Sequence, residues 1–451
     1  MRLNIAGLMR SALPLAALLL LAACPHTSSY TIGGTVTGLT SSVGPQSSVV
    51  LQDNGGDNLT ISANGPFTFA TAVTSTSTTS ASYNVTVLTQ PIGQTCTVTG
   101  GSGTATSNVT SVVVNCSGTT ANYAYVVNAG GNVSQYAIGA NGTLTELASP
   151  VAAGTTPYSI AVVPSGLYAY VANSGNNNVS EYTISSGVLT PNTIAATVAA
   201  GSKPVSVTVD STGQYAYVVN AGNGSIPGTI SQYTIGNDGT LAAMAPATVT
   251  AGLSPYSIAV DPLGPYAYVA NYGDGTVSEY TSTGGALTQL ATISAGSNPY
   301  SVTIDPLGRY AYVANYGSNN VSQYSIGAGG VLAAMTAGPV AAGSNPISVT
   351  VDPSGTHAYV ANYSSGAIAG TVSEYSISTG GALTAMTPAT VAAGPNPESV
   401  TVDPSGQFAY VANYGSNNVS QYTISSGVLT SNTAAATVTS GTQPISVITA
   451  K

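Results

Sequence analysis

The segment Tyr310-Ala311-Tyr312-Val313-Ala314-Asn315 is one copy of a motif, A-Y-V-[A/V]-N, that occurs seven times in the chain. Consecutive copies are separated by 44 to 51 residues, and they end at Asn128, Asn173, Asn220, Asn271, Asn315, Asn362 and Asn413. Self-similarity at this period indicates stacked supersecondary units, none of which can bury its apolar face alone. The sequence therefore predicts a repeat architecture of seven units.

The unit that contains this segment predicts four short antiparallel strands. Residues 299–304 and 310–315 alternate between small or polar and larger side chains, and the D-P-L-G sequence at 305–308 is typical of a type I turn. Residues 321–326 form a third strand, and a G-x-L step at Gly330 leads into a weaker fourth. Four strands in each of seven repeats predict an all-β chain with a seven-bladed β-propeller.

The two ends of the repeat array predict how the ring closes. The first unit begins with a second strand, Tyr123 to Asn128, and no P-x-S strand precedes it. The last unit is followed by Pro444-Ile445-Ser446, which starts a P-x-S strand without a second strand after it. We expect this last strand to complete the first blade.

The consensus P-x-S-V-x-V-D-P-x-G-x-Y-A-Y-V-A-N resembles the repeat of the YVTN and lactonase-like seven-bladed propellers, over roughly residues 119–451. That family includes phosphogluconolactonase-type hydrolases, surface-layer proteins and many exported proteins. The resemblance therefore implies the fold and leaves the chemistry open. If the chain were a lactonase of this fold, the resemblance implies basic and acidic side chains around a central cleft.

The first 24 residues predict a bacterial lipoprotein signal peptide. A basic start precedes a short apolar core, and the L-A-A-C sequence at 21–24 is similar to a lipobox, whose cysteine becomes the lipidated first residue. An ordinary signal peptide with a chance cysteine is the alternative. Lipidation at Cys24 would anchor the protein in the cell envelope, at the outer membrane or cell surface, with residues 25–29 as a tether.

Residues 30–117 predict a small immunoglobulin-like β-sandwich before the propeller. About seven short alternating stretches, with Asn-Gly turn signals between them, occur in this module. Cys96 and Cys116 are the only cysteines after Cys24, and a disulfide between them fits an oxidising compartment. A metal pair is the alternative, but no histidine or third cysteine lies nearby. Residues 118–121 are expected to link this module to a propeller at 122–451.

Charged residues make up only 4% of the chain. Beyond the signal peptide the sequence keeps Lys203, Arg309 and Lys451 against 14 carboxylates, so it offers nothing that could follow a phosphate backbone. We therefore expect no nucleic-acid partner and no membrane contact other than the lipid anchor. A surface of Ser, Thr, Asn and Gly is typical of an exported protein. We expect the protein to be a monomer.

The remaining polar residues predict no catalytic constellation. His357 takes the aromatic position before A-Y-V, and Arg309 lies in the turn after Gly308, so we interpret both as structural. Aspartates begin the first turn of most blades, and the V-S-[E/Q]-Y position accepts either residue. Because no Ser-His-Asp set, metal cluster or Gly-rich phosphate loop is present, we expect no catalytic residue, no metal site and no cofactor.

One face of the propeller is expected to gather candidate ligand-binding residues. The loop between the second and third strands returns to the P-x-S end of each blade, so side chains from both places meet there. Glu398 takes the x of P-x-S, where other blades have Tyr, Val or Ile; it would either orient a ligand or lie on a solvated rim. The candidates are Glu398, Tyr158, Tyr256, Tyr300, Tyr272, Tyr316, Tyr363 and Tyr414.

These observations favour a lipid-anchored, non-enzymatic propeller that presents a Tyr/Asn-rich face to an extracytoplasmic protein or glycan. The first alternative is a lactonase-like hydrolase of the 6-phosphogluconolactonase type, acting in the central cleft. The second alternative is a structural protein of the cell envelope. The three hypotheses differ in whether Glu398 acts on a bound molecule, orients it, or does neither.

Overall fold

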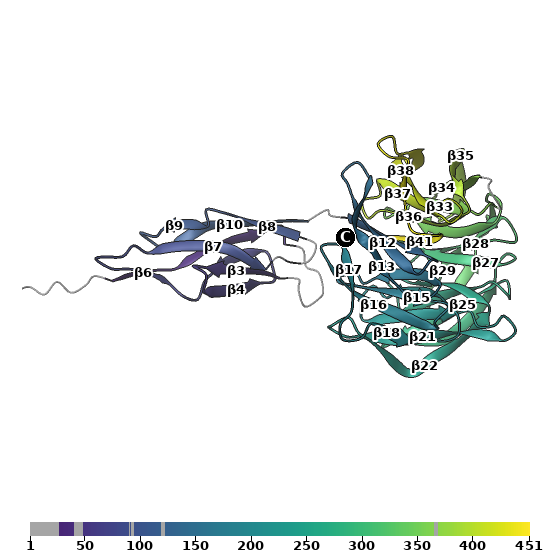
Figure 1. The fold of residues 1–451 in the computed structure, drawn as a ribbon, viewed down its shortest axis with the longest axis horizontal. Helices are drawn as coiled ribbons and strands as arrows, with labels where there is room; N and C mark the ends of the chain where they lie inside the picture. Colours follow the sequence, from purple (N-terminus) through teal and green to yellow (C-terminus); the bar gives the residue numbers. More distant parts are fainter. Residues whose placement is uncertain (1–26, 40–47, 90, 92–93, 119–121, 365–368) are drawn as a thin grey trace, which may run out of the picture. The chain divides into compact units, whose positions relative to one another are not determined.

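The structure is a computed structural model that describes residues 27–39, 48–89, 91, 94–118, 122–364 and 369–451 (Figure 1). The chain divides into two compact units. All regular elements in these residues are β-strands. The same part of the chain contains no long apolar helix of the kind that crosses a bilayer.

The N-terminal unit packs two four-stranded sheets around one core, as the predicted sandwich requires. One sheet has the order β5-β2-β10-β8 and the other the order β4-β3-β7-β9. Ile32, Val49 and Val112 are fully buried between them. A disulfide joins Cys96 on β8 to Cys116 on β10, so the predicted pairing is confirmed. The resemblance to immunoglobulin domains stays a prediction.

The strands of this unit are β1 (Ser28–Tyr30), β2 (Ile32–Thr37), β3 (Val49–Asp53), β4 (Asp57–Ile61), β5 (Gly65–Thr68), β6 (Val73–Ser75), β7 (Ser82–Thr89), β8 (Gln94–Thr99), β9 (Ser102–Thr104) and β10 (Val109–Gly118).

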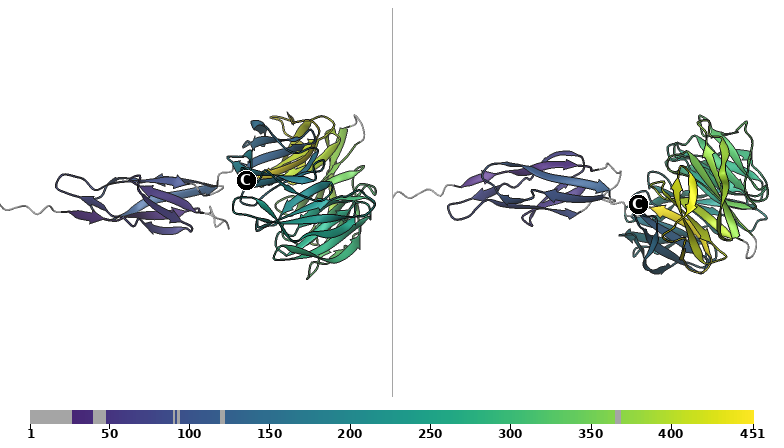
Figure 2. Two further views of the ribbon diagram at one scale, coloured as in Figure 1. Left: turned by 60° about the horizontal axis from the view of Figure 1, so that its bottom comes forward. Right: turned by 90° about the horizontal axis from the view of Figure 1, so that it is seen from above.

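The second unit is a seven-bladed β-propeller, which confirms the predicted fold (Figure 2). Each blade is an antiparallel sheet whose innermost strand begins at the P-x-S proline and whose second strand is the A-Y-V-x-N motif. Four blades have four strands, and in the other three the outermost strand is split into two.

The strand bounds follow the repeats. Blade 1 contains β11 (Asn122–Asn128), β12 (Asn132–Ile138), β13 (Leu144–Ala152) and β41 (Pro444–Ala450). Blade 2 contains β14 (Pro157–Val162), β15 (Tyr168–Asn173), β16 (Asn178–Ser185), β17 (Val188–Pro191) and β18 (Thr197–Ala199). Blade 3 contains β19 (Pro204–Val209), β20 (Tyr215–Asn220), β21 (Pro227–Ile235) and β22 (Leu241–Leu253). Blade 4 contains β23 (Pro255–Val260), β24 (Tyr266–Asn271), β25 (Thr276–Thr283) and β26 (Ala286–Ser294).

Blade 5 contains β27 (Pro299–Ile304), β28 (Tyr310–Asn315), β29 (Asn320–Ile326), β30 (Leu332–Ala334) and β31 (Val340–Ala341). Blade 6 contains β32 (Pro346–Val351), β33 (His357–Asn362), β34 (Ala369–Ile377) and β35 (Leu383–Pro395). Blade 7 contains β36 (Pro397–Val402), β37 (Phe408–Asn413), β38 (Asn418–Ser425), β39 (Val428–Ser431) and β40 (Thr437–Thr439).

Blade 1 is built from both ends of the repeat array. Strand β41 pairs antiparallel with β11, with Tyr123 opposite Ala450 and Val126 opposite Val447. Figure 1 shows β41, in yellow, beside the blue strands of this blade. The ring is therefore closed by the last strand, as the offset of the repeats predicts.

Small side chains let the innermost strands approach one another at the axis. The serine of P-x-S in one blade accepts a hydrogen bond from a backbone N–H of the next blade. Ser159 Oγ lies 3.3 Å from Val207 N, and Ser257 Oγ lies 3.1 Å from Val302 N. The same bond joins blades 5 to 6, 6 to 7 and 7 to 1.

Aromatic side chains of the second strand reach the turn of the next blade. The central tyrosine of A-Y-V donates its hydroxyl to the carbonyl of the G-x-L glycine, as Tyr125 does to Gly187 at 2.9 Å, and this bond is present in all seven blades. The aromatic residue two positions earlier packs on the same glycine. His357 fills this position against Gly427, so its interpretation as a structural substitute agrees with its surroundings.

A buried amide or carboxyl of the third strand also connects neighbouring blades. The third residue of V-S-[E/Q]-Y accepts the backbone N–H of the leucine in the next G-x-L turn, as Gln135 does from Leu189 at 2.5 Å and Glu181 does from Leu241 at 3.0 Å. This bond recurs at every blade boundary. We call it the inter-blade lock.

The two residue types at the lock are not equivalent once they are buried. Gln135 also donates its amide N–H to the carbonyl of Ser149 at 3.1 Å. Gln232 and Gln323 donate in the same way, whereas Gln421 Nε2 is buried without a partner among the described residues. A carboxylate cannot donate, and Glu181 Oε1 and Glu374 Oε2 are also buried without a hydrogen-bond partner in the described residues. Burial raises the pKa of Glu181 to about 7 and also raises the pKa values of Glu279 and Glu374.

Glu181→Gln is expected to make the protein more stable at neutral pH. The folded-state pKa of Glu181 lies above its unfolded value, so stability is fully present below pH 4.5 and falls as the pH rises to about 7. At ~1.4 kcal/mol per pKa unit, the fall is about 3–4 kcal/mol. Denaturant unfolding at pH 4.5 and pH 7.5 should show a smaller pH difference in Glu181→Gln than in the native sequence.

The reciprocal variant Gln135→Glu is the control, because it places a carboxyl at an equivalent lock. It should add a loss of stability over the same pH range. If the free energy of unfolding depended equally on pH in the native sequence, Glu181→Gln and Gln135→Glu, the pH dependence could not be assigned to the carboxyl at the inter-blade lock.

Deletion of residues 444–451 is expected to open the ring, because β11 would lose its partner β41. Ala124 and Val126, both fully buried in the closed ring, would then face solvent. Limited proteolysis should cut the first blade, and the thermal unfolding of the propeller should move to a lower temperature. Removal of Lys451 alone is the control. A deletion variant as protease-resistant as this control would contradict closure by β41.

Candidate functional site

The seven innermost strands surround an axial cavity of about 110 Å³. Each blade contributes the x residue of its P-x-S sequence to the wall, and these residues are Tyr158, Val205, Tyr256, Tyr300, Ile347, Glu398 and Ile445. A water molecule occupies about 30 Å³ of liquid, so the cavity has room for ~three or four waters or for a small ring. Aromatic, aliphatic and acidic side chains all occur at this position, so the wall of the cavity does not share the symmetry of the blades.

Two tyrosines from non-neighbouring blades meet in this cavity. The hydroxyls of Tyr158 in blade 2 and Tyr300 in blade 5 are hydrogen-bonded to each other. Burial, followed by the charge of Glu398, raises the pKa of Tyr158, and burial raises the pKa of Tyr300, so both phenols stay protonated at neutral pH. Since only one of the two protons lies between the oxygens, the other is free to be donated to a ligand.

Glu398 is the only acid among the x residues of P-x-S, as the sequence indicates. Its side chain is partly buried, and its carboxylate has no hydrogen-bond partner in the part of the chain that the structure describes. Burial raises the pKa of Glu398 to about 7. A carboxyl with this pKa exchanges a proton readily at neutral pH, which is the property required of a general base.

Further ring contacts extend the tyrosine cluster outward from the axis over blades 4 and 5. Tyr256 and Tyr300 are 4.7 Å apart between ring centroids, and Tyr272 and Tyr316, which follow the motif asparagines, are 6.3 Å apart. Tyr256 lies 5.3 Å from Tyr272, and Tyr300 lies 6.3 Å from Tyr316. We call these four residues the aromatic strip. All four side chains are partly exposed.

The other predicted binding residues are placed differently. Tyr363 accepts a hydrogen bond from Asn396 Nδ2 at 2.6 Å. Tyr414 has no ring contact with the aromatic strip among the described residues. All seven motif asparagines are buried, and Asn173 Oδ1 accepts the backbone N–H of Gly154 in the loop before its own blade. Cys24 lies outside the described residues.

The basic residues of the repeats lie away from the axial cavity. Arg309 forms an ion pair with Asp305 at 3.0 Å, in the turn at the opposite end of its blade. His357 packs on Gly427 at a blade boundary. Lys203 is exposed in the connection between blades 2 and 3. Among the described residues that line the cavity, none is basic.

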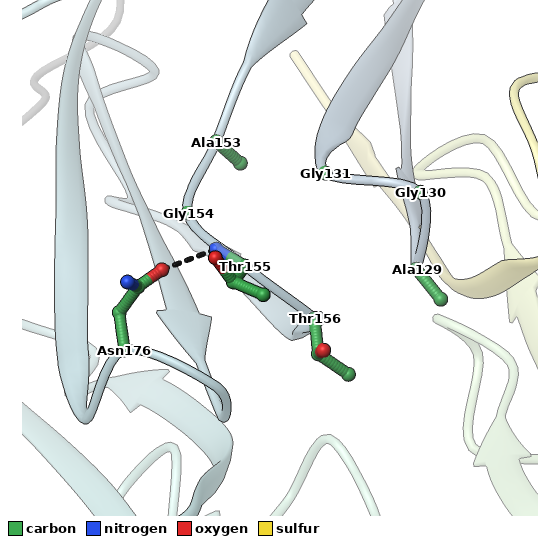
Figure 3. Close-up of a pocket in the computed structure, with 8 residues that line it drawn as sticks. All are labelled: Ala129, Gly130, Gly131, Ala153, Gly154, Thr155, Thr156 and Asn176. Atoms are coloured by element: carbon green, nitrogen blue, oxygen red, sulfur yellow. Dashed lines mark hydrogen bonds between the residues drawn. The ribbon is translucent and has the colours of Figure 1, made fainter.

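A larger recess of about 420 Å³, which the sequence does not predict, lies between blades 1 and 2 on the P-x-S face (Figure 3). Its walls are Ala129, Gly130, Gly131, Ala153, Gly154, Thr155, Thr156 and Asn176. The Asn176 amide oxygen accepts the backbone N–H of Thr155. The available signal was Ala129, which follows its motif asparagine where blades 4 to 7 have tyrosine. No ionisable side chain lines this recess among the described residues, so it offers no catalytic group.

The repeats match a family model described as "Lactonase, 7-bladed beta-propeller" over residues 186–286 and 332–446. The matched residues include the inner strands of blades 3, 4, 6 and 7 together with Glu398. A comparison of the chain with curated proteins found no match. The chain is therefore lactonase-like over much of the propeller.

Several solved structures share the fold of the propeller. A protein of Bacteroides uniformis, provisionally assigned as a 6-phosphogluconolactonase, is 17% identical with a TM-score of 0.62, covering 73% of this chain and 98% of its own. A similar protein of Bacteroides fragilis is 18% identical with a TM-score of 0.61, covering 74% and 99%. The periplasmic gluconolactonase of Pseudomonas aeruginosa is 17% identical with a TM-score of 0.57, covering 73% and 99%. At these identities the likeness shows the fold alone.

We expect the Glu398 carboxyl to titrate with a midpoint near pH 7, because burial raises its pKa. The chain has only five glutamates, so carbon-13 NMR of protein labelled at the glutamate carboxyls can resolve each one. The signal that disappears in Glu398→Gln identifies the residue. A midpoint near ~4.3, the value of an ordinary glutamate, would contradict the burial of this carboxyl.

Proposed function

We propose that the protein hydrolyses a neutral lactone in the axial cavity, with Glu398 as the general base. The observation that carries this proposal is the position of Glu398. It is a carboxyl with a pKa of about 7, without a hydrogen-bond partner among the described residues, in the same axial cavity of about 110 Å³ as the Tyr158–Tyr300 hydroxyl pair. The match to the lactonase family model supports the same reaction class.

The reaction needs only groups that line this cavity. Ionised Glu398 accepts a proton from a water molecule, and the water oxygen forms a bond to the lactone carbonyl carbon. The free phenolic proton of the Tyr158–Tyr300 pair is donated as a hydrogen bond to the carbonyl oxygen, where negative charge develops. When the ring C–O bond breaks, protonated Glu398 returns its proton to the leaving oxygen, which gives the hydroxy acid.

The charges of the site favour an unphosphorylated substrate. A phosphate group is normally held by Arg or Lys, and no basic residue lines the described cavity wall. The names of the two Bacteroides proteins refer to a phosphorylated lactone, and the proposed substrate differs from it because it carries no phosphate. The proposed substrate is closer to the gluconolactone in the name of the Pseudomonas protein.

Glu398→Gln is expected to lower kcat/KM for glucono-1,5-lactone by ~10²–10⁴-fold, the usual contribution of a general base. In the native sequence the rate should rise with pH through about 7, because the ionised form of Glu398 is the active one. Acid release in a pH-stat between pH 5.5 and 7.5 measures both effects, with the spontaneous hydrolysis of the lactone subtracted.

Glu181→Gln is the matched control for this experiment. It also removes a carboxyl whose pKa is raised to about 7, but at an inter-blade lock remote from the cavity wall. It should keep the activity of the native sequence. Native activity in Glu398→Gln would contradict the proposed role, and absence of lactone hydrolysis in the native protein would contradict the function.

Non-enzymatic binding of a neutral glycan or protein is the second candidate. It is favoured by the aromatic strip, which supplies rigid partly exposed phenols without a nearby basic residue. In that case Glu398 would orient the bound molecule, and Glu398→Gln would weaken binding while the native protein left lactones intact.

We also propose that the protein acts outside the cytoplasm, held in the bacterial envelope by lipid on Cys24. The lipobox-like sequence and the Cys96–Cys116 disulfide support an exported protein. Metabolic labelling with a palmitate analogue should mark the native protein and not Cys24→Ser. Labelling of both proteins alike would contradict lipidation at Cys24.

A further inference from the structure

Two residue positions in each blade face the P-x-S side of the propeller, and their comparison shows where the ring departs from symmetry. The inner position is the x of P-x-S, and the outer position follows the motif asparagine. The inner and outer residues, in that order, are Ile445 and Ala129 in blade 1, Tyr158 and Ser174 in blade 2, Val205 and Ala221 in blade 3, Tyr256 and Tyr272 in blade 4, Tyr300 and Tyr316 in blade 5, Ile347 and Tyr363 in blade 6, and Glu398 and Tyr414 in blade 7. Only blades 4 and 5 carry tyrosine at both positions.

The aromatic strip is therefore a local feature of two neighbouring blades, and it is continuous with the axial cavity. Its inner members, Tyr256 and Tyr300, line the cavity wall. Its outer members, Tyr272 and Tyr316, contact the inner pair with centroid distances of 5.3 to 6.3 Å. A molecule that reacts beside Glu398 can therefore reach the strip without leaving the cavity wall, because Glu398, Tyr256 and Tyr300 line the same cavity.

The charge around the strip restricts what can lie on it. On the P-x-S face of blades 4 to 7, the charged residues in the described sequence are Asp274 and Glu398, both acidic. Asp274 is engaged, because its carboxylate accepts the backbone N–H of Leu253 at 2.6 Å. A phosphate or carboxylate on the ligand would thus meet only like charge, whereas a neutral ligand would meet none.

We propose that the aromatic strip is a subsite for a neutral sugar ring, so that the substrate is the lactone of a glycosylated aldonic acid and not a monosaccharide lactone. This inference rests on the proposed lactone hydrolysis. A sugar ring presents an apolar face of C–H groups to an aromatic ring and hydroxyls at its edge. Partly exposed phenols match both, because they combine a large apolar surface with a hydroxyl and lose little conformational freedom on binding.

The experiment compares glucono-1,5-lactone with the 1,5-lactones of cellobionic and maltobionic acid, which add one neutral glucose in β or α linkage. The native protein should hydrolyse at least one disaccharide lactone with a kcat/KM at least tenfold higher than that for gluconolactone. The double variant Tyr272→Ala/Tyr316→Ala should lose this preference through KM and keep its activity on gluconolactone. Retained gluconolactonase activity shows that the variant is folded.

Tyr414→Ala is the matched control, because it removes the tyrosine at the outer position of blade 7, outside the strip. It should keep the preference for the disaccharide lactone. The subsite would be overturned by equal kcat/KM for all three lactones, by a preference that survives in the double variant, or by faster hydrolysis of 6-phosphogluconolactone.

A second measurement separates failure of the subsite from failure of the proposed reaction. Isothermal titration of the native protein with cellotriose and maltotriose tests the strip without any hydrolysis. Tyrosine-dependent binding of either trisaccharide, lost at least tenfold in the double variant, supports the sugar subsite even if no lactone is hydrolysed. If the native protein hydrolyses gluconolactone but binds neither trisaccharide, the sugar subsite is overturned and the proposed reaction stands.

Discussion

The buried hydrogen bond from a third-strand Gln or Glu to the leucine N–H of the next blade holds the ring together. It occurs at all seven boundaries, and at each of them a tyrosine hydroxyl bonds to the adjacent glycine carbonyl of the same turn. Because donor and acceptor are both buried, breaking either bond leaves an unsatisfied polar group. No blade can rotate without breaking the bonds on both of its sides, so the inner ends of the strands are held in fixed positions.

This fixed frame separates the residues that repeat from those that can specialise. The lock and the aromatic residues of the second strand are repeated around the ring because each boundary has the same geometry. The x residue of P-x-S takes no part in these bonds, and it varies from Ile445 to Tyr300 to Glu398 without disturbing the frame. A chemical site can therefore form at the axis of a nearly symmetric molecule, where one carboxyl faces two phenols.

The repeat spacing and the offset of its ends were enough to predict the blades, their number and the pairing of β41 with β11. They were enough because strand order follows from chain order. The Tyr158–Tyr300 bond was not predictable, because it joins blades 2 and 5 across the axis and depends on side-chain directions that no spacing encodes. The unequal behaviour of Gln135 and Glu181 was also missed, since both residues accept the same bond and differ only in whether they can donate another.

The pairing of β11 with β41 also has a consequence for how the chain reaches its native state. Tyr123 and Ala450 stand opposite each other although nearly the whole propeller lies between them in sequence. Such a contact of high sequence separation makes folding slow, because a long loop must close before the strand pair adds any stability. Until then the free edge of β11 can pair with another chain, and newly synthesised molecules would be vulnerable to edge-to-edge aggregation.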